Sequence, residues 1–247
     1  MEILVVNDDG YDAEGIKILA NALKRFGNVT LVAPNGGRSA SSHSIVMREP
    51  IEFNKVFVLD GIEAYSCSGM PADCVRLSTS ILNKKFDIVF SGINNGLNCG
   101  TDIVYSGTVA AAKEAIIEGI PSVAISSDFG DFSLAIKEID SLLAYIFKNK
   151  LYSIDYVLNV NFPINTFKKS KGYRFTKQGI KNFKTEFMQN NKGSYDVLSD
   201  KITYDLDMDT DVSLGRDGYI TFVPVGVDQT NHNYVKKLKE FDIWTYT

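Results

Sequence analysis

The sequence predicts an α/β protein built on a Rossmann-like, doubly wound and mostly parallel sheet. First, short and almost continuous apolar runs recur along the chain, which is typical of strands covered on both faces. Second, segments with apolar side chains at helical spacing lie between these runs. Alternating strands and helices pack most simply as parallel strands joined by right-handed crossovers. Ligands of such sheets bind beyond the carboxyl ends of the strands.

The N-terminal elements follow this alternation. Residues 3–6 form an apolar run that predicts a strand, and residues 16–23 carry an apolar stripe at helical spacing. A second strand is predicted at 29–34, where it ends at a proline. The stretch 35–44 is too rich in Gly and Ser for regular structure, so we expect a long loop at a strand end. An extended segment is predicted at 53–59.

The middle of the chain repeats the pattern. Pro71 is well placed at the first position of a helix, and the apolar spacing that follows makes Cys74 a core residue of that helix. The remaining elements are a strand at 87–90, a Gly/Asn-rich loop at 91–100, a helix at about 107–118, a strand at 122–126 and a helix through Ile136, Ile139, Leu143 and Ile146.

The C-terminal part changes character, and we expect it to decorate the core within one domain of residues 1–247. The Rossmann-like core covers about 1–150, and extra strands, loops and a C-terminal helix cover about 151–247. The predicted features are a strand at 156–161, a basic loop at 168–171, a polar connection without helical period at 188–201, an acidic stretch at 205–211, a strand at 218–223 and a helix at about 231–241.

Composition excludes several classes of protein. The chain has 247 residues, with 26 Lys and Arg against 30 Asp and Glu, so a formal charge of −4 argues against binding to nucleic-acid polymers. No apolar run approaches the roughly 18 residues of a membrane span, so no membrane partner is expected. The first residues lack the basic and apolar regions of a signal peptide, which favours a cytoplasmic protein.

Cysteine and histidine are scarce. Three cysteines without a CxxC pair favour reduced thiols over a disulfide framework or a structural zinc site. His43 and His232 alone cannot supply a site that needs three imidazoles. Any metal is therefore expected to have oxygen ligands.

Three polar loops that follow predicted strands carry the candidate chemistry. Asp8 and Asp9 follow the first strand, where two adjacent carboxylates favour a divalent cation as their neutraliser. Taken alone, this pair is better explained as a cap at the start of the next helix. The second loop, 37–44, offers hydroxyls, a guanidinium and an imidazole, and by itself is typical of a solvated loop.

The third loop gives the strongest signal. Its glycines allow close approach of backbone to a ligand, and it leads through Ser106, Gly107 and Thr108 into an alanine-rich helix. The free N–H groups at a helix start suit an anion, phosphate first. An ordinary N-cap and turn-forming asparagines explain each part separately, but their convergence with the Asp pair favours a phosphate site. No GxGxxG or GxxxxGK[ST] motif is present, which excludes dinucleotide dehydrogenases and P-loop enzymes, and Gly10 lies where an aspartyl-phosphate enzyme would place a second carboxylate.

At these loops the sequence resembles the SurE family, the stationary-phase survival proteins that are metal-dependent nucleoside monophosphate phosphatases. The resemblance rests on ILVVNDDG, VAPNGGRSASSHSI, SGINNGLNCGTDIVYSGTVAAAKEA and GYITFVPVGVDQT, which occur in the family's order over nearly the whole chain. Ala40 stands where the family often has glycine, and residues 167–200 carry no motif that aligns.

The resemblance implies a set of site residues. The metal ligands fall on Asp8, Asp9, Ser39 and Asn94, an oxygen set that suits one Mg²⁺ or Mn²⁺ per subunit. The implied phosphate contacts are Asn98, Ser106, Gly107 and Thr108. The implied activity is hydrolysis of nucleoside monophosphates, with 5′ and 3′ preference and short polyphosphate as a further substrate left open. The C-terminal region is expected to assemble a homodimer or homotetramer.

Several roles stay open at this point. Asp8 or Asp9 is the candidate catalytic base, with direct attack of water favoured over a phospho-aspartate. His43 protonates the leaving oxygen or simply packs in its loop, Arg38 screens phosphate charge, and Tyr105 stacks on a base or packs beside the glycines. A nucleotide-binding protein without turnover is the alternative to an enzyme.

Overall fold

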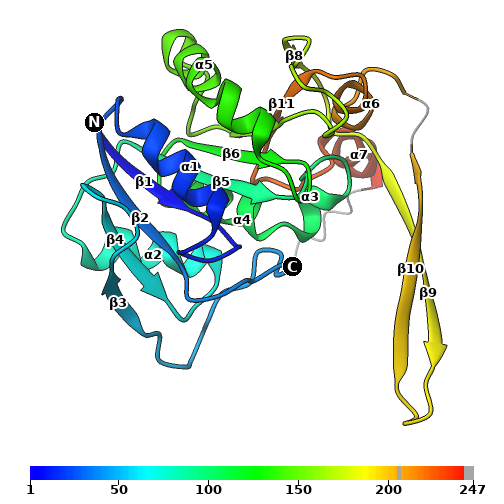
Figure 1. The fold of residues 1–247 in the computed structure, drawn as a ribbon. Helices are drawn as coiled ribbons and strands as arrows, with labels where there is room; N and C mark the ends of the chain where they lie inside the picture. The colour runs from blue at the N-terminus through cyan, green and yellow to red at the C-terminus, as the bar shows by residue number, and fades with distance from the viewer. Residues whose placement is uncertain (205–206, 242–247) are drawn as a thin grey trace, which may run out of the picture.

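The computed structural model describes residues 1–204 and 207–241, and it confirms the predicted α/β class. Nine strands form one twisted sheet in the order β3-β4-β2-β1-β5-β6-β7-β11-β8 (Figure 1). All neighbouring strands are parallel except β3 with β4 and β11 with β7. The strands of this sheet are β1 Glu2–Val6, β2 Asn28–Pro34, β3 Phe53–Val56, β4 Glu63–Cys67, β5 Ile88–Asn95, β6 Ser122–Ser127, β7 Val157–Asn161, β8 Tyr173–Phe175 and β11 Ile220–Val225.

Helices cover both faces of the sheet, as a doubly wound fold requires. One face packs against α1 and α5, and the other against α2 and α4. No described helix is long and apolar enough to cross a membrane. The helices are α1 Glu14–Leu23, α2 Pro71–Ile81, α3 Asp102–Tyr105, α4 Gly107–Ile117, α5 Ser133–Asn149, α6 Asp211–Arg216 and α7 His232–Leu238, followed by a 3₁₀ turn at Lys239–Phe241.

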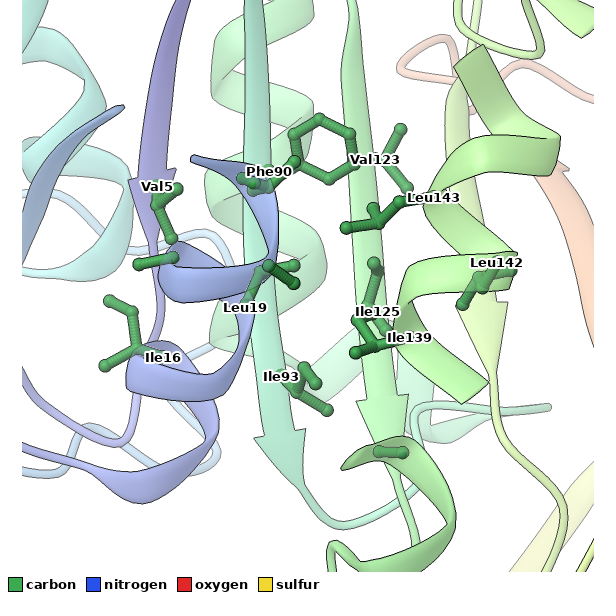
Figure 2. Close-up of a cluster of buried hydrophobic side chains, with 14 of the residues drawn as sticks. Val5, Ile16, Leu19, Phe90, Ile93, Val123, Ile125, Ile139, Leu142 and Leu143 are labelled. Carbon is green, nitrogen blue, oxygen red and sulfur yellow. The ribbon is translucent and has the colours of Figure 1, made fainter. Parts of the chain in front are cut away.

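The two-fold periodicity of strands explains why the runs are continuously apolar. In β1, Ile3 and Val5 point toward α1 and α5, whereas Leu4 and Val6 point toward α2 and α4. Figure 2 shows the first of these interfaces, where Leu19 of α1 and Leu143 of α5 lie over the central strands. Both faces of β1 are therefore core, and an alternating apolar and polar pattern is absent from it.

The order of the strands creates a switch point between β1 and β5. The chain runs from β1 outward to β2 and β4 on one side, then returns to β5 and continues outward to β6 and β7. Crossover connections therefore diverge above the carboxyl ends of β1 and β5, which leaves a crevice at that edge. Two of the three predicted site loops leave the sheet there.

Two expectations for regular structure are wrong. The polar connection expected at 188–201 belongs to a long antiparallel hairpin, β9 Lys181–Gln189 and β10 Tyr195–Tyr204, which projects away from the sheet in Figure 1. The loop expected at 91–100 is strand as far as Asn95, because β5 continues to pair with β6 across a register shift. Strand β4 is an element that we did not predict, and the extended segment at 53–59 is strand only as far as Val56.

The C-terminal expectations are otherwise confirmed in place and type. The strand expected at 156–161 is β7, the strand at 218–223 is β11, and the final helix is α7 with its 3₁₀ turn. The sequence did not predict β8 or α6. Within the acidic stretch at 205–211, residues 205 and 206 lie outside the described residues.

Candidate active site

The carboxyl edge of the sheet gathers most of the predicted site into one cavity of about 210 Å³. Asp8 and Asp9 reach it from the end of β1, Ser39 from the loop after β2, and Asn94 from the end of β5. The register shift before Asn94 is a bulge, a feature that often aims a side chain at a site. The cavity is lined by Asp8, Asp9, Ser39, Ala40, Asn94, Asn95, Asn98, Asp102, Tyr105 and Ser106.

Asp8 is almost fully buried, with 5% of its surface exposed. Its Oδ1 accepts a 2.5 Å hydrogen bond from the Thr108 hydroxyl at the start of α4. Burial raises the pKa of Asp8 from 3.8 to about 6, against the lowering effect of the Thr108 hydrogen bond, and the neighbouring Asp9 charge raises it further. At neutral pH the Asp8 carboxylate is therefore ionised in surroundings where little water stabilises its charge.

Asp9 and Asn94 are each held by one hydrogen bond. The backbone N–H of Asn95 donates to Asp9 Oδ2 at 3.1 Å, and burial raises the pKa of the Asp9 carboxyl. The Asn94 side-chain N–H₂ donates to the Gly96 carbonyl at 2.7 Å, which leaves its amide oxygen as the acceptor toward the cavity. In residues 1–204 and 207–241, no cationic side chain forms an ion pair with either aspartate.

The donor set restricts which metal these residues suit. The described residues contain no group of three or more His, Cys, Asp or Glu side chains that could hold a metal. The cavity instead combines two carboxylates with a hydroxyl and an amide oxygen. Such a set matches the hard cations Mg²⁺ and Mn²⁺ and not zinc.

The start of α4 forms the other wall of the site. The Ser106 hydroxyl caps the helix by accepting from the Val109 N–H at 3.0 Å. Gly107 lies directly against Asp8, since a Cβ placed there would meet Asp8 Cβ at 2.9 Å. The Ser41 hydroxyl would lie 2.7 Å from the same Cβ, and its Oγ is buried without a hydrogen-bond partner. An unpaired buried hydroxyl beside a helix N-terminus fits a site whose ligand supplies the missing partner.

Asn98 is fixed from three directions. Its backbone N–H donates to Asn161 Oδ1 at 2.8 Å, and its side chain donates to the Ser126 hydroxyl at 2.9 Å. Its carbonyl accepts from the side chains of Asn159 and Asn161. These buried asparagines on β7 hold the loop in place, and no pattern in the sequence predicts their role.

Four predicted residues lie outside the lining of this cavity. Gly107 and Thr108 pack behind it against Asp8, as described above. The Arg38 guanidinium donates to the Asn35 side chain and to the Ser68 carbonyl, both at 3.2 Å, so it holds the loop. His43 Nε2 lies 2.7 Å from Glu114 Oε2 and lines a neighbouring cavity.

The structure also adds a residue that the loop pattern did not single out. Asp102 lines the cavity, and its carboxylate pairs with the Lys181 ammonium at the base of the β9–β10 hairpin. The Lys181 N–H donates to the Thr101 hydroxyl at 3.0 Å. Asp102 and Lys181 lie 79 positions apart, and no sequence pattern predicts that they meet. Their contact depends on the hairpin, which we did not predict.

The fold and the site together define a Rossmann-like α/β protein with a cavity of oxygen donors beside a helix N-terminus at the switch point of its sheet. A family profile described as Survival protein SurE matches residues 3–185. The chain belongs to the SurE family.

Similar proteins cover the chain almost end to end. A protein of Clostridium botulinum (strain Loch Maree / Type A3) named 5'-nucleotidase SurE is 41% identical over 249 residues, covering 97% of this chain and 98% of the relative. One of Alkaliphilus metalliredigens with the same name is 39% identical, covering 98% and 99%. The crystal structure of the Sure protein from Aquifex aeolicus superposes with a TM-score of 0.81 at 35% identity, covering 98% of this chain and 99% of that one.

Replacing Gly107 with alanine is expected to damage the site more than the fold. The added Cβ lies 2.7 Å from Ser41 Oγ and 3.0 Å from Asp8 Oδ2, so one of these groups must move. We expect phosphate release to fall about 10²-fold, with a loss of about 1–3 kcal/mol in unfolding free energy. Gly215→Ala is the matched control, because a Cβ there meets nothing within 4 Å. Wild-type turnover by Gly107→Ala would contradict the close packing at the start of α4.

Proposed function

We propose that the chain is a divalent-metal-dependent phosphatase that hydrolyses nucleoside monophosphates to nucleoside and phosphate. The observation that carries this proposal is that Asp8 and Asp9 are buried together, without a cationic side chain, in a cavity that also receives the start of α4. One half of that cavity suits a cation and the other half suits an anion. The names of the relatives support the same activity.

The residues that would hold the metal are Asp8, Asp9, Ser39 and Asn94. Their oxygens line one cavity, and the raised pKa values of the two aspartates reflect burial that a bound cation would offset. When bound, a divalent cation supplies charge stabilisation for a phosphoryl oxygen and a lower pKa for a coordinated water.

The chain itself positions the reacting groups. Ser106 and the N–H groups at the start of α4 hold phosphate oxygens. Positioning of this kind is a main contribution of a protein to phosphoryl transfer. Thr108 holds the Asp8 carboxylate by its hydroxyl, and the Asn95 N–H holds Asp9. One of the two aspartates orients or deprotonates the attacking water, and the two titrate as a pair. Gly10 two positions after Asp8 disfavours a phospho-aspartate route.

We also propose that the chain is one domain whose C-terminal region assembles a homodimer or homotetramer. The β9–β10 hairpin exposes apolar side chains that pack on no core. Helix α7 has no buried residue and exposes further apolar side chains. These exposed residues are Phe187, Met188, Tyr195, Val197, Leu198, Tyr234 and Leu238. Apolar patches of this kind mark contact surfaces.

Phosphate release from a panel of 5′- and 3′-nucleoside monophosphates and a short polyphosphate tests the proposed activity. The protein is stripped with EDTA and assayed without added metal, then with Mn²⁺ or Mg²⁺. We expect turnover only with metal, because the two buried carboxylates need a cation. The panel also ranks 5′ against 3′ substrates and shows whether polyphosphate is cleaved.

The second candidate function is nucleotide binding without turnover, since the helix start can hold a phosphate on its own. The same panel separates the two candidates. If metal-supplied, folded protein releases phosphate from none of the nucleotides while equilibrium dialysis detects their binding, the phosphatase proposal is wrong and the binding protein replaces it.

A further inference from the structure

A second cavity adjoins the candidate active site and has no role in the function proposed above. Its volume is about 560 Å³, and Ser106 lines both cavities. The short helix α3 separates them, with Asp102 and Tyr105 facing the smaller cavity and Ile103 and Val104 facing the larger one. The two hollows therefore meet at the residue that caps α4.

The sizes of the two cavities indicate that each one accommodates a different part of the substrate. The metal-site cavity of about 210 Å³ is below the roughly 300 Å³ at which pockets begin to accommodate organic ligands. It has room for a cation and a phosphoryl group, so the rest of a nucleotide must lie elsewhere. The larger cavity begins at Ser106 and falls within the size range of small-molecule sites.

Residues from the N-cap onward of α4 line this cavity in a row along the helix axis. Ser106, Ala110 and Lys113 are spaced by four and three residues, and all three line the cavity. At the rise of an α-helix, Lys113 lies about 10 Å along the axis from Ser106. A phosphate at Ser106 and a group near Lys113 are thus separated by about the length of a nucleoside.

Among the described residues that line this cavity, Lys113 is a cation that is open to a ligand. It is half-buried, burial lowers its pKa, and no described acid pairs with it. The other charged groups are engaged, since Lys177 pairs with Asp207 and Asp228 accepts from His232 at 2.9 Å. Three residues of β11, Val223, Pro224 and Val225, also line the cavity and make part of its surface apolar.

We propose that this cavity binds the nucleoside part of the substrate and that Lys113 donates to the acceptor edge of its base, with a preference for guanine. This inference rests on the proposed function. A lysine ammonium only donates hydrogen bonds. Guanine presents O6 and N7 as adjacent acceptors, whereas adenine places an amino donor at the position of O6. Lys113 therefore selects GMP over AMP.

The test compares three substrates in the metal-supplied enzyme: GMP, AMP and phenyl phosphate, whose leaving group carries neither ribose nor base. For Lys113→Met we expect the KM of GMP to rise about tenfold with kcat unchanged. The KM of AMP changes less than about threefold, and kcat/KM for phenyl phosphate is unchanged. Guanosine, as a product inhibitor, loses about tenfold in affinity for the variant. Lys113→Arg, which keeps the donor, retains the low KM for GMP.

Lys148→Met on the exposed surface of α5 is the matched control, and its KM values are expected to equal those of the wild type. Equal effects of Lys113→Met on GMP and phenyl phosphate, or no effect on GMP, overturn the assignment of the cavity while the phosphatase proposal stands. If the wild type hydrolyses none of the three substrates, the proposed function itself fails, and this inference fails with it.

Discussion

Asp8→Asn is expected to lower kcat for phosphate release by about 10³-fold or more and to abolish tight Mn²⁺ binding. The substitution removes one of two adjacent charges with which no cationic side chain of the described residues forms an ion pair. It preserves the shape of the site, because an asparagine oxygen can still accept from the Thr108 hydroxyl that now donates to Asp8 Oδ1. The expected loss is therefore one of charge and not of fold.

Two measurements separate these effects. Mn²⁺ binding to the stripped protein is followed by electron paramagnetic resonance, which reports the free ion without any turnover, and far-UV circular dichroism reports the fold. Asp12→Asn is the matched control, because Asp12 is an exposed aspartate four positions away that pairs only with Lys17 on the surface. A folded Asp8→Asn protein with wild-type Mn²⁺ affinity would rule out Asp8 as a ligand.

The sheet and the position of the site were predictable because both depend on local patterns. Strands buried on both faces are continuously apolar, and this pattern identified β1, β2, β5, β6 and β7. Parallel strands end at one edge, so polar residues that follow β1, β2 and β5 had to meet. The cavity that contains Asp8, Asp9, Ser39 and Asn94 agrees with that expectation.

The parts that were missed depend on contacts distant in sequence. Strand β9 of the hairpin has no fully buried side chain, so it lacks the apolar alternation by which strands are recognised, and its pairing with β10 holds it in place. His43 and Arg38 lie in a loop that resembled a ligand-binding loop, yet their side chains turn toward Glu114 and Ser68. Sequence shows that a loop is polar but not which way each side chain points.

The contribution of Asp8 to the free energy of unfolding of the metal-free protein is expected to become more favourable as pH falls from 7.5 to 4. In the fold the pKa of Asp8 is about 6, against an ordinary value of 3.8. The folded chain therefore holds the proton more tightly than the unfolded chain, and the ionised carboxylate destabilises the fold above pH 6. The difference between the two pKa values corresponds to about 3 kcal/mol at pH 7.5.

Comparison with Asp8→Asn measures the contribution of Asp8 together with its coupling to Asp9, because the other titrating groups are common to both proteins. Urea unfolding in EDTA is expected to show the variant more stable than the wild type at pH 7.5, with the difference shrinking by about 2.5 kcal/mol down to pH 4. A wild-type minus Asp8→Asn difference independent of pH would show that Asp8 ionises in the fold as readily as in water.

Saturating metal is expected to make the wild type more stable than Asp8→Asn. On the proposed metal site, saturating Mn²⁺ is expected to stabilise the folded wild type through the ionised carboxylates and to leave Asp8→Asn almost unchanged. Protons compete for the same oxygens, so this stabilisation is expected to weaken as pH falls below 6. On the proposed metal site, the burial that destabilises the ionised Asp8 carboxylate in the metal-free protein is the same burial that a bound cation would offset.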